Sequence, residues 1–198
     1  MPAAACRMVT ALREQPHGKV AVELDGEPWR VLPADAVVGA GLGLGRPLDR
    51  ERARDLARAL RRARALTTAT RALRQRNRTS KELADRLERA GVVASARAEA
   101  LAALEGAGLV DDGRFAHARA EALARRGYGN TAIRADLARR GVHPDLVEEA
   151  VAALEPEPTR ARRLLVHDGA DAKHVRRLVA RGFDRETLLD ALRFADRD

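Results

Sequence analysis

The side chains in this 198-residue chain that could do chemistry are few, and one group of them has the residue types of a metal site. His167, Asp168, Asp171 and His174 are histidines and carboxylates, which are common zinc ligands. Gly169 is expected to break the helix between the two pairs, so their spacing predicts no common face. We therefore interpret the four residues as loop and cap residues, and we expect no metal site.

A glycine-rich stretch at residues 39–45 suggests a second kind of chemistry, nucleotide binding. The dinucleotide fingerprint would require glycine in place of Leu44, and no Gly-Lys-Ser/Thr follows to hold a phosphate. We interpret the stretch as a flexible connection. Cys6 is the only cysteine, which excludes an internal disulfide and a site with several cysteine ligands. No serine lies in a nucleophile-elbow motif, so we expect no enzyme and no cofactor.

The arginines are more informative, because they are unevenly distributed. The chain carries a formal net charge of +8. The excess lies in residues 45–110, which hold 16 basic and 8 acidic side chains, while the segments on either side are close to neutral. A basic region of this kind predicts an anionic partner, either nucleic acid or an acidic protein surface.

Nine residues are the candidates for contact with that partner. They lie before and along the predicted helix that starts at Thr79, and just before the one that starts at Asn130. They are Arg74, Arg76, Arg78, Lys81, Arg86, Arg89, Arg125, Arg126 and Tyr128. The simpler interpretation is that the arginines are solvated side chains at helix ends, favoured there by the helix dipole. Since residues 111–154 are neutral overall, we expect charge reversal at Arg139 and Arg140 to weaken binding less than reversal of the first three candidates.

These candidates belong to an internal repeat. Residues 79–104 return at residues 130–154 with a constant offset of 50, and a shorter copy follows 41 residues later. Leu87, Leu137 and Leu178 occupy matching positions. Each copy predicts a helix, a glycine stop and a second helix, and an earlier helix precedes each pair. Such units bury their apolar faces only by packing against their neighbours.

Helix signals recur in every copy. Thr79 and Glu82 form a capping box, and His143 with Pro144 fits a helix start. Further caps are expected at Ser95, Asn130, Asp171 and Asp184. Left-handed glycine stops are expected at Gly91, Gly141 and Gly182. The helices that precede the three pairs are expected at residues 66–76, 111–126 and 159–168.

The region before the repeats differs in pattern. Residues 19–32 alternate between apolar and polar around Asp25-Gly26, which predicts a β-hairpin. Because a lone hairpin is marginal in water, residues 36–38 or a neighbouring helix are expected to complete its packing. Asp49 is expected to cap a strongly basic helix at residues 50–64 that bends into the first repeat.

The predicted fold is therefore mainly α, with three tandem three-helix repeats in an extended curved array behind a small β region. The predicted segments are 1–45 for the β region and its connection, 46–64 for the basic helix, and 65–110, 111–155 and 156–198 for the repeats. No stretch is long and apolar enough to span a membrane, and no signal-peptide core is present. We expect a cytoplasmic monomer.

The most specific local pattern lies between the first two repeats, at residues 104–116, LEGAGLVDDGRFA. Together with R-x-R-x-S-x-x-L from Arg76 and G-x-G from Gly127, it resembles the RecX family, the bacterial regulators of the RecA recombinase. The resemblance covers residues 66–154 strongly. It implies tandem three-helix repeats and a non-enzymatic protein that binds RecA and its DNA filament. Such a protein inhibits the recombinase and its coupled ATPase, and so modulates recombinational repair and the SOS response.

Within this pattern, Asp111 and Asp112 are interpreted first as a helix cap and dipole partners, and Phe115 as a core anchor, ahead of direct contact with a partner. Two functional hypotheses remain. The first is a modulator that binds RecA. The alternative is a helical-repeat protein that binds DNA directly through its basic first-repeat region, which would show a steep salt dependence on naked DNA.

Overall fold

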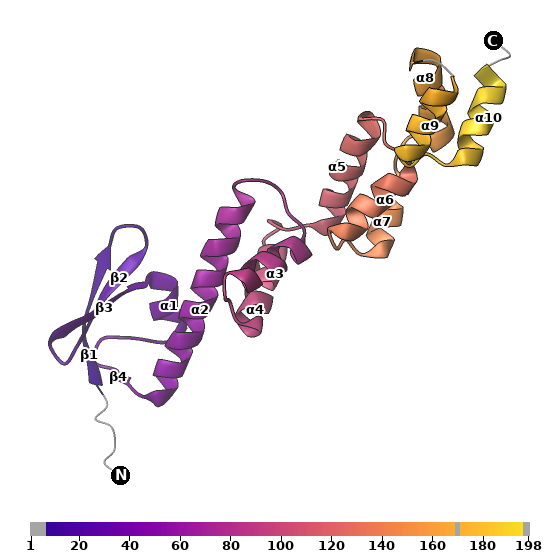
Figure 1. The fold of residues 1–198 in the computed structure, drawn as a ribbon. Coiled ribbons are helices and arrows are strands. Elements are labelled where there is room, and N and C mark those ends of the chain that lie inside the picture. The colour runs from indigo at the N-terminus through magenta and orange to yellow at the C-terminus, as the bar shows by residue number, and fades with distance from the viewer. Residues whose placement is uncertain (1–6, 169–170, 196–198) are drawn as a thin grey trace. The chain divides into compact units, whose positions relative to one another are not determined.

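A computed structural model describes residues 7–168 and 171–195, so that Cys6 and Gly169 lie outside the described part. The chain divides into two compact units. The first unit holds the chain up to Gln75 together with residues 84–106, and the second holds residues 76–83 and the chain from Ala107 onward. The fold is mainly helical, with a strand region before the helices, as the sequence predicts (Figure 1).

The first unit begins with a four-stranded antiparallel sheet in the order β3-β2-β1-β4. Its strands are β1 (Arg7–Gln15), β2 (Lys19–Leu24), β3 (Glu27–Pro33) and β4 (Pro47–Leu48). The predicted hairpin is confirmed as β2 and β3, and Asp25 and Gly26 both have positive φ, as a tight hairpin turn requires. Strand β1 was not predicted, because its pattern is interrupted where its register on β2 shifts between Val9 and Ala11.

The glycine-rich stretch is an ordered part of this unit, so its interpretation as a flexible connection is wrong. The amide of Gly45 donates to the carbonyl of Val9, whose own amide donates to the carbonyl of Arg46. Leu42 is buried in the core beneath the sheet. The stretch therefore delivers β4 to the edge of β1, and the left-handed glycines Gly41 and Gly45 permit the turns.

Two helices cover the sheet. Helix α1 (Ala34–Gly39) lies between the sheet and α2 (Arg50–Leu73) and buries Ala36 and Val37, so the expected packing of the hairpin is confirmed (Figure 1). Asp49 caps α2 by accepting a hydrogen bond from the amide of Arg52 at 2.8 Å. Helix α2 is continuous, and the expected boundary between residues 64 and 65 falls inside it.

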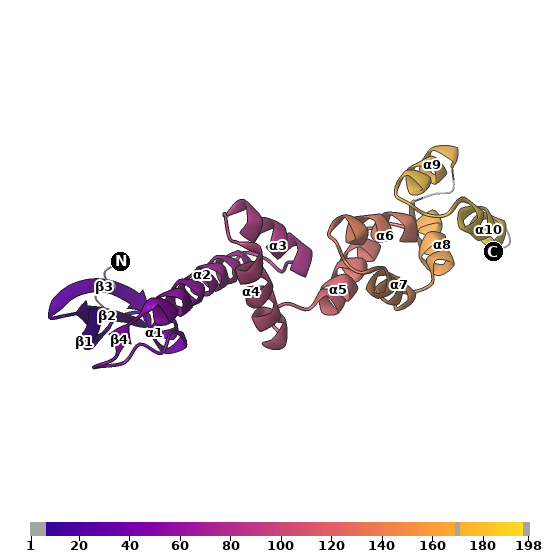
Figure 2. The ribbon, with the colours of Figure 1, turned by 90° about the horizontal axis from the view of Figure 1, so that it is seen from below.

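The three-helix repeats are confirmed. The second half of α2 is followed by α3 (Ser80–Arg89) and α4 (Ala94–Gly106), and the next repeat comprises α5 (Asp112–Arg125), α6 (Asn130–Arg139) and α7 (Pro144–Ala152). The third comprises α8 (Glu157–Asp168), α9 (Ala172–Ala180) and α10 (Arg185–Ala195), and Figure 2 shows the helices of each of these repeats from a second side. Gly91, Gly141 and Gly182 have φ of 72°, 76° and 85°, which confirms the left-handed stops.

Most of the predicted caps are confirmed, and two are wrong. The side chains of Thr79, His143, Asp171 and Asp184 each accept a hydrogen bond from the amide two or three residues further on. Ser95 lies inside α4, and Asn130 is the first residue of α6, whose N-cap is Gly129. The side chain of Asn130 is used elsewhere, as an acceptor for Arg160.

Candidate functional site

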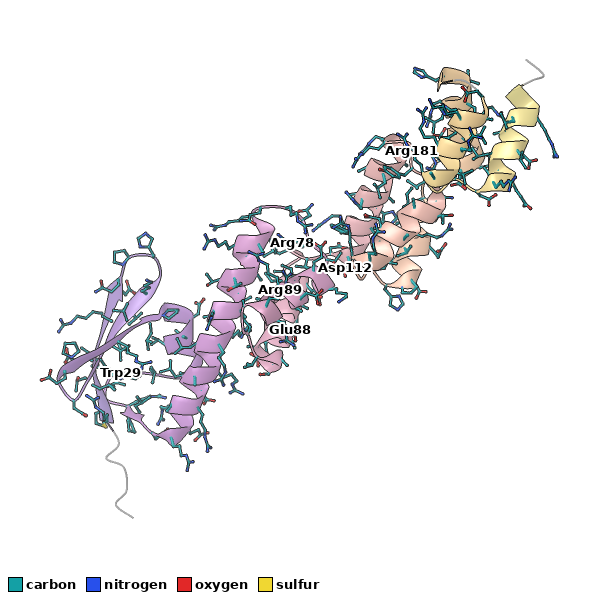
Figure 3. All side chains as sticks on the ribbon, viewed as in Figure 1. Trp29, Arg78, Glu88, Arg89, Asp112 and Arg181 are labelled. Atoms are coloured by element: carbon teal, nitrogen blue, oxygen red, sulfur yellow. The ribbon has the colours of Figure 1, made fainter. Side chains whose placement is uncertain are left out.

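The first turn of α3 is held by the second repeat through a set of hydrogen bonds. The hydroxyl of Thr79, which is fully buried, donates to the carbonyl oxygen of Arg140 at 2.7 Å and accepts from the amide of Glu82 at 3.1 Å. Asp112, whose side chain is labelled in Figure 3, accepts from the amide of Ser80 at 2.8 Å. The Thr79 hydroxyl therefore both caps the start of α3 and binds the second repeat, whereas the Glu82 carboxylate, which a capping box would turn back to the Thr79 amide, binds Arg140.

A network of charges lies beside this contact. The guanidinium of Arg140 donates to Glu82 at 2.6 Å and to Asp136 at 3.0 Å, and Arg119 donates to Asp136 at 2.8 Å. The hydrogen bond from Arg119, followed by that from Arg140, lowers the pKa of Asp136 to about 2. The same bond raises the pKa of Arg119. Glu82 and Asp136 are thus already paired with arginines of the same chain.

The second and third repeats meet in the same way. The amide of Gly129 donates to the carbonyl of Arg181 at 3.0 Å, and the amide of Thr131 donates to the carbonyl of Gly182 at 3.1 Å. A Cβ on Gly129 would lie 2.2 Å from the carbonyl oxygen of Gly182, so only glycine allows the two backbones to approach. At the α3 contact, a Cβ on Gly141 would likewise collide with the side chain of Lys81.

Arg160 is a buried cation at this second contact. Its guanidinium donates to the carbonyls of Tyr128 and Glu155, both at 2.9 Å, and to the side chain of Asn130. Burial lowers its pKa, although three of its five donors have acceptors. Arg160 therefore holds the loop before α6 in place, which is a structural use of an arginine.

The partner-binding candidates of the first unit differ in exposure. Arg74, at the end of α2, and Arg89, near the end of α3, are exposed. Arg86 is half-buried, and its Nε has no hydrogen-bond partner in the described part of the chain. Arg74 and Arg89 are therefore the members of this group with side chains that a partner can reach.

The candidates of the second unit are divided by their contacts. Arg76 pairs with Glu82 at 3.0 Å, and the side chain of Lys81 lies against Gly141. Arg125 pairs with Glu121 at 3.4 Å. The guanidinium of Arg126 lies 5.8 Å from the ring centre of Tyr128, so this pair is brought together by the fold.

The residues of the LEGAGLVDDGRFA pattern have structural contacts. Asp111 caps α5 by accepting from the amide of Arg114 at 2.8 Å, and Asp112 binds the first turn of α3. Phe115 packs on the core of the second repeat, with the guanidinium of Arg140 6.0 Å from its ring centre. Each therefore has the cap or core contact that the structural interpretation requires.

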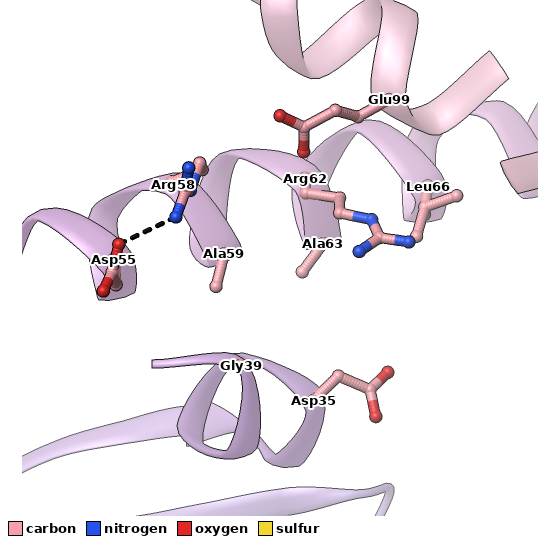
Figure 4. Close-up of a pocket in the computed structure, with 9 residues that line it drawn as sticks. All are labelled: Asp35, Gly39, Asp55, Arg58, Ala59, Arg62, Ala63, Leu66 and Glu99. Carbon is pink, nitrogen blue, oxygen red and sulfur yellow. Dashed lines mark hydrogen bonds and ion pairs between the residues drawn. The ribbon is translucent and has the colours of Figure 1, made fainter. Parts of the chain in front are cut away.

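A hollow of about 510 Å³ in the first unit has mixed charges. It is lined by Asp35 of α1, Asp55, Arg58 and Arg62 of α2, and Glu99 of α4, together with apolar residues (Figure 4). Asp55 and Arg58 form an ion pair at 2.8 Å. Acids and bases balance closely here, so this flank of α2 offers little net field to a charged partner.

A second flank of α2 is uniformly basic. Arg50, Arg54 and Arg61 recur at spacings of four and seven, which places them on one face of the helix. All three are exposed, and the described residues provide no carboxylate partner for any of them. Along the helix axis they span about 16 Å. We call these three residues the α2 arginine face.

Two of the residues first considered for a metal site have structural contacts of their own. Asp171 caps α9, and Nδ1 of the buried His174 lies 2.8 Å from a guanidinium nitrogen of Arg177, while the side chain of Asp168 lies outside the described part. The described residues contain no group of three or more histidine, cysteine or acidic side chains that could hold a metal ion. No helix among them is long and apolar enough to cross a membrane.

Sequence reasoning missed the ion-pair network between α3 and the second repeat and the contact of Arg160 between the second and third repeats. The members of the network are Glu82, Arg119, Asp136 and Arg140. Asp136 and Arg140 have the i,i+4 spacing of a helical ion pair, which is the one local signal for this network. The other partners are between 17 and 58 residues apart in the chain, so no local pattern could have connected them.

Comparison with known proteins places this architecture in a family. A family model described as RecX, second three-helix domain, matches residues 111–151. The regulatory protein RecX of Xanthomonas campestris pv. campestris (strain B100) is 35% identical over 130 residues, which cover 61% of this chain and 80% of that protein. The regulatory protein RecX of Acidithiobacillus ferrooxidans (strain ATCC 53993 / BNL-5-31) is 34% identical over 128 residues, which cover 63% and 85%.

Two solved structures share the fold. The crystal structure of regulatory protein RecX matches with a TM-score of 0.80 at 19% identity, over 93% of this chain and 99% of that chain. The crystal structure of RecX from Lactobacillus salivarius matches with a TM-score of 0.60 at 18% identity, over 70% and 98%. With 35% identity across 80% of a RecX protein, this chain belongs to the RecX family of regulatory proteins.

Proposed function

We propose that this protein binds RecA and RecA-DNA filaments and inhibits the recombinase and its coupled ATPase, and so modulates recombinational repair and the SOS response. Membership of the RecX family supports the proposal. The observation that carries it is the arrangement of charge around α6. Glu82, Asp112 and Asp136 are engaged in internal bonds, whereas arginines such as Arg126 remain exposed. Such a surface suits a large anionic partner better than a small substrate.

Co-sedimentation tests the proposal directly. RecA is assembled on single-stranded DNA with a non-hydrolysable nucleotide, and the purified protein is centrifuged with these filaments or with the DNA alone. We expect the protein to sediment with filaments and to remain in solution with DNA alone, and to inhibit RecA-promoted strand exchange at the concentrations at which it sediments. Equal recovery with DNA alone, or none with filaments, would exclude RecA as the principal partner.

A second candidate function is direct binding of nucleic acid, and the α2 arginine face favours it. Its three guanidinium groups are exposed on one rigid helix and lack carboxylate partners in the described part, so they are available to phosphates. The test compares the salt dependence of binding to naked DNA for wild type and for Arg50→Glu/Arg54→Glu/Arg61→Glu. The matched control is Arg58→Glu/Arg62→Glu, on the flank that faces acids.

If DNA contact is direct, the triple variant will reduce the salt slope of log K by about 3, while the control changes it less. An unchanged slope would rule out this face as a DNA contact. RecA-dependent sedimentation that survives in the triple variant would leave RecA binding as the function.

A further inference from the structure

A groove of about 630 Å³ lies in the second unit where the second and third repeats meet. Its walls come from the end of α5, from the outward face of α6 and from the end of α9. Leu123, Ala132, Ala135 and Val179 supply apolar surface, and Arg126 and Arg139 supply charge. We call it the α6 groove. Val179 is 42% exposed there, so the groove presents apolar surface to solvent.

The walls of the α6 groove are fixed to one another by backbone contacts. The hydrogen bonds from Gly129 to Arg181 and from Thr131 to Gly182 join α6 to the turn after α9. There is no room for a Cβ on Gly129, so the two segments are in direct contact. A groove held in this way is already formed before a ligand arrives, and binding then requires little ordering of the protein.

The charges in the α6 groove favour an anion. Asp136 is the acid in its wall, and it is occupied by Arg119 at 2.8 Å and Arg140 at 3.0 Å. Arg126 has no carboxylate partner among the described residues, and Arg139, whose side chain is 74% exposed, lies 3.5 Å from an acid that two arginines already bind. Both guanidinium groups are therefore available to carboxylates of a ligand.

We propose that the α6 groove binds a peptide segment of the protein partner in which a glutamate or aspartate lies next to an apolar side chain. The apolar side chain packs on Ala132, Ala135 and Val179, and the carboxylates pair with Arg126 and Arg139. Nucleic acid fits less well, because its phosphates would leave the apolar surface of Ala132, Ala135 and Val179 without an apolar partner. The inference rests on the proposed function, because it concerns how the groove binds a segment of RecA in the filament.

Two groove variants and two matched controls test this in the full-length protein. Ala135→Trp fills the groove from an exposed helical position, and Arg126→Glu/Arg139→Glu reverses its charge. Ala102→Trp and Arg163→Glu/Arg193→Glu make the same changes at exposed positions away from the groove. Circular dichroism establishes that each variant is folded. Binding is measured to RecA filaments, and by fluorescence anisotropy to a labelled peptide of Glu-Glu-Leu triplets, to its Lys-Lys-Leu counterpart and to oligo-dT.

We expect both groove variants to lose at least tenfold in affinity for filaments and for the Glu-Glu-Leu peptide, and both controls to bind as wild type. Groove variants that bind filaments as well as wild type would overturn the inference. So would wild-type protein that does not prefer the Glu-Glu-Leu peptide, or oligo-dT that binds as tightly as this peptide and is lost in Ala135→Trp. If wild type binds no filaments but holds the peptide in the groove, the proposed function fails and the groove inference stands.

Discussion

Asp136 links α6 to two arginines, and its protonation should be visible in the stability of the protein. Its pKa is lowered from 3.8 to about 2 in the folded state, so it stabilises the fold above the unfolded value, and this contribution is lost as pH falls toward 2. The side chain is only 15% exposed, and the shift corresponds to about 2 kcal/mol. We expect Asp136→Asn to lower the free energy of unfolding at pH 7 by about 2–3 kcal/mol.

Urea titrations between pH 5 and pH 2 check this sign. Wild type should lose about 2 kcal/mol more than Asp136→Asn over this interval, because the variant has no carboxylate to protonate. Asp145→Asn is the control, since the side chain of Asp145 is 91% exposed. If the free energy of unfolding fell equally in wild type and in Asp136→Asn between pH 5 and pH 2, the network would not stabilise the ionised form of Asp136.

Substitution of Gly129 tests whether the backbones of the second and third repeats are in direct contact. At Gly129 the φ of −82° is allowed for alanine, so the effect of Gly129→Ala is steric rather than conformational. The added methyl would lie 2.2 Å from backbone atoms of Gly182 and Phe183, which cannot move without separating the repeats. We expect a loss of about 2–3 kcal/mol by chemical denaturation. Gly106→Ala, where nothing lies within 4 Å, should be close to neutral, and equal melting of the two variants would contradict the contact.

At the scale of elements, the first turn of α3 depends on one hydroxyl. Thr79→Val keeps the shape of the side chain but removes the cap of α3 and the hydrogen bond to Arg140. Because two buried backbone groups lose their partner, we expect a loss of about 2–3 kcal/mol in the free energy of unfolding. Thr79→Ser, which keeps the hydroxyl, should lose less. Thr67→Val, at an exposed hydroxyl on α2, should be near neutral in the same denaturation experiment. A valine variant as stable as the serine variant would contradict the proposed role.

The matching leucines of the three repeats make a second test at this scale. Leu87, Leu137 and Leu178 are at most 1% exposed. Truncation of each to alanine should therefore cost about 2–5 kcal/mol, since it removes buried methyl groups and leaves a cavity. Leu109→Ala, at a side chain that is 58% exposed, is the control. Thermal melts of the three core variants that superpose on wild type would show that these positions are not the repeat cores.

At the scale of the whole molecule, the distribution of charge along the chain predicts which region binds a filament. Arg74 and Arg89 are the exposed candidates of the first unit and lie in the basic region, so Arg74→Glu/Arg89→Glu should weaken filament binding severalfold, most clearly at low salt, where the regional field is least screened. Arg193→Glu, in a nearly neutral region, is the control. Titration of strand-exchange inhibition at two salt concentrations makes the comparison, and equal effects of the two variants would refute a role for the regional charge.

Arg139 and Arg140 are poor controls for the arginines of the basic region, although the charge distribution suggests them. Arg140 binds both Glu82 and Asp136, so its reversal would report on the stability of the fold and not on docking. Arg139 lies in the α6 groove, so the groove inference expects its reversal to weaken binding, whereas the neutral charge of its region predicts a small effect. The filament-binding measurements on Arg126→Glu/Arg139→Glu decide between these two expectations.

The repeats, their glycine stops and most of their caps could be predicted from the sequence alone. These signals are local, because a cap acts on an amide a few residues away and a left-handed glycine acts on its own turn. The β2–β3 hairpin was found for the same reason, from Asp25 and Gly26 between alternating strands. The family pattern at residues 104–116 also consists of such signals, since Asp111 is the cap of α5.

Only the tertiary structure decided which charges remain for a partner. Arg76, Arg125 and Arg126 look alike in the sequence, yet the first pairs with Glu82, the second with Glu121, and the third lies over Tyr128 in the α6 groove. The ordered glycine stretch was missed because its hydrogen bonds join segments more than 30 residues apart, and strand β1 was missed because its pattern is interrupted at the register shift between Val9 and Ala11. Pairing at such distances depends on how the helices and strands pack, and packing is a property of the whole unit that no local pattern of residues contains.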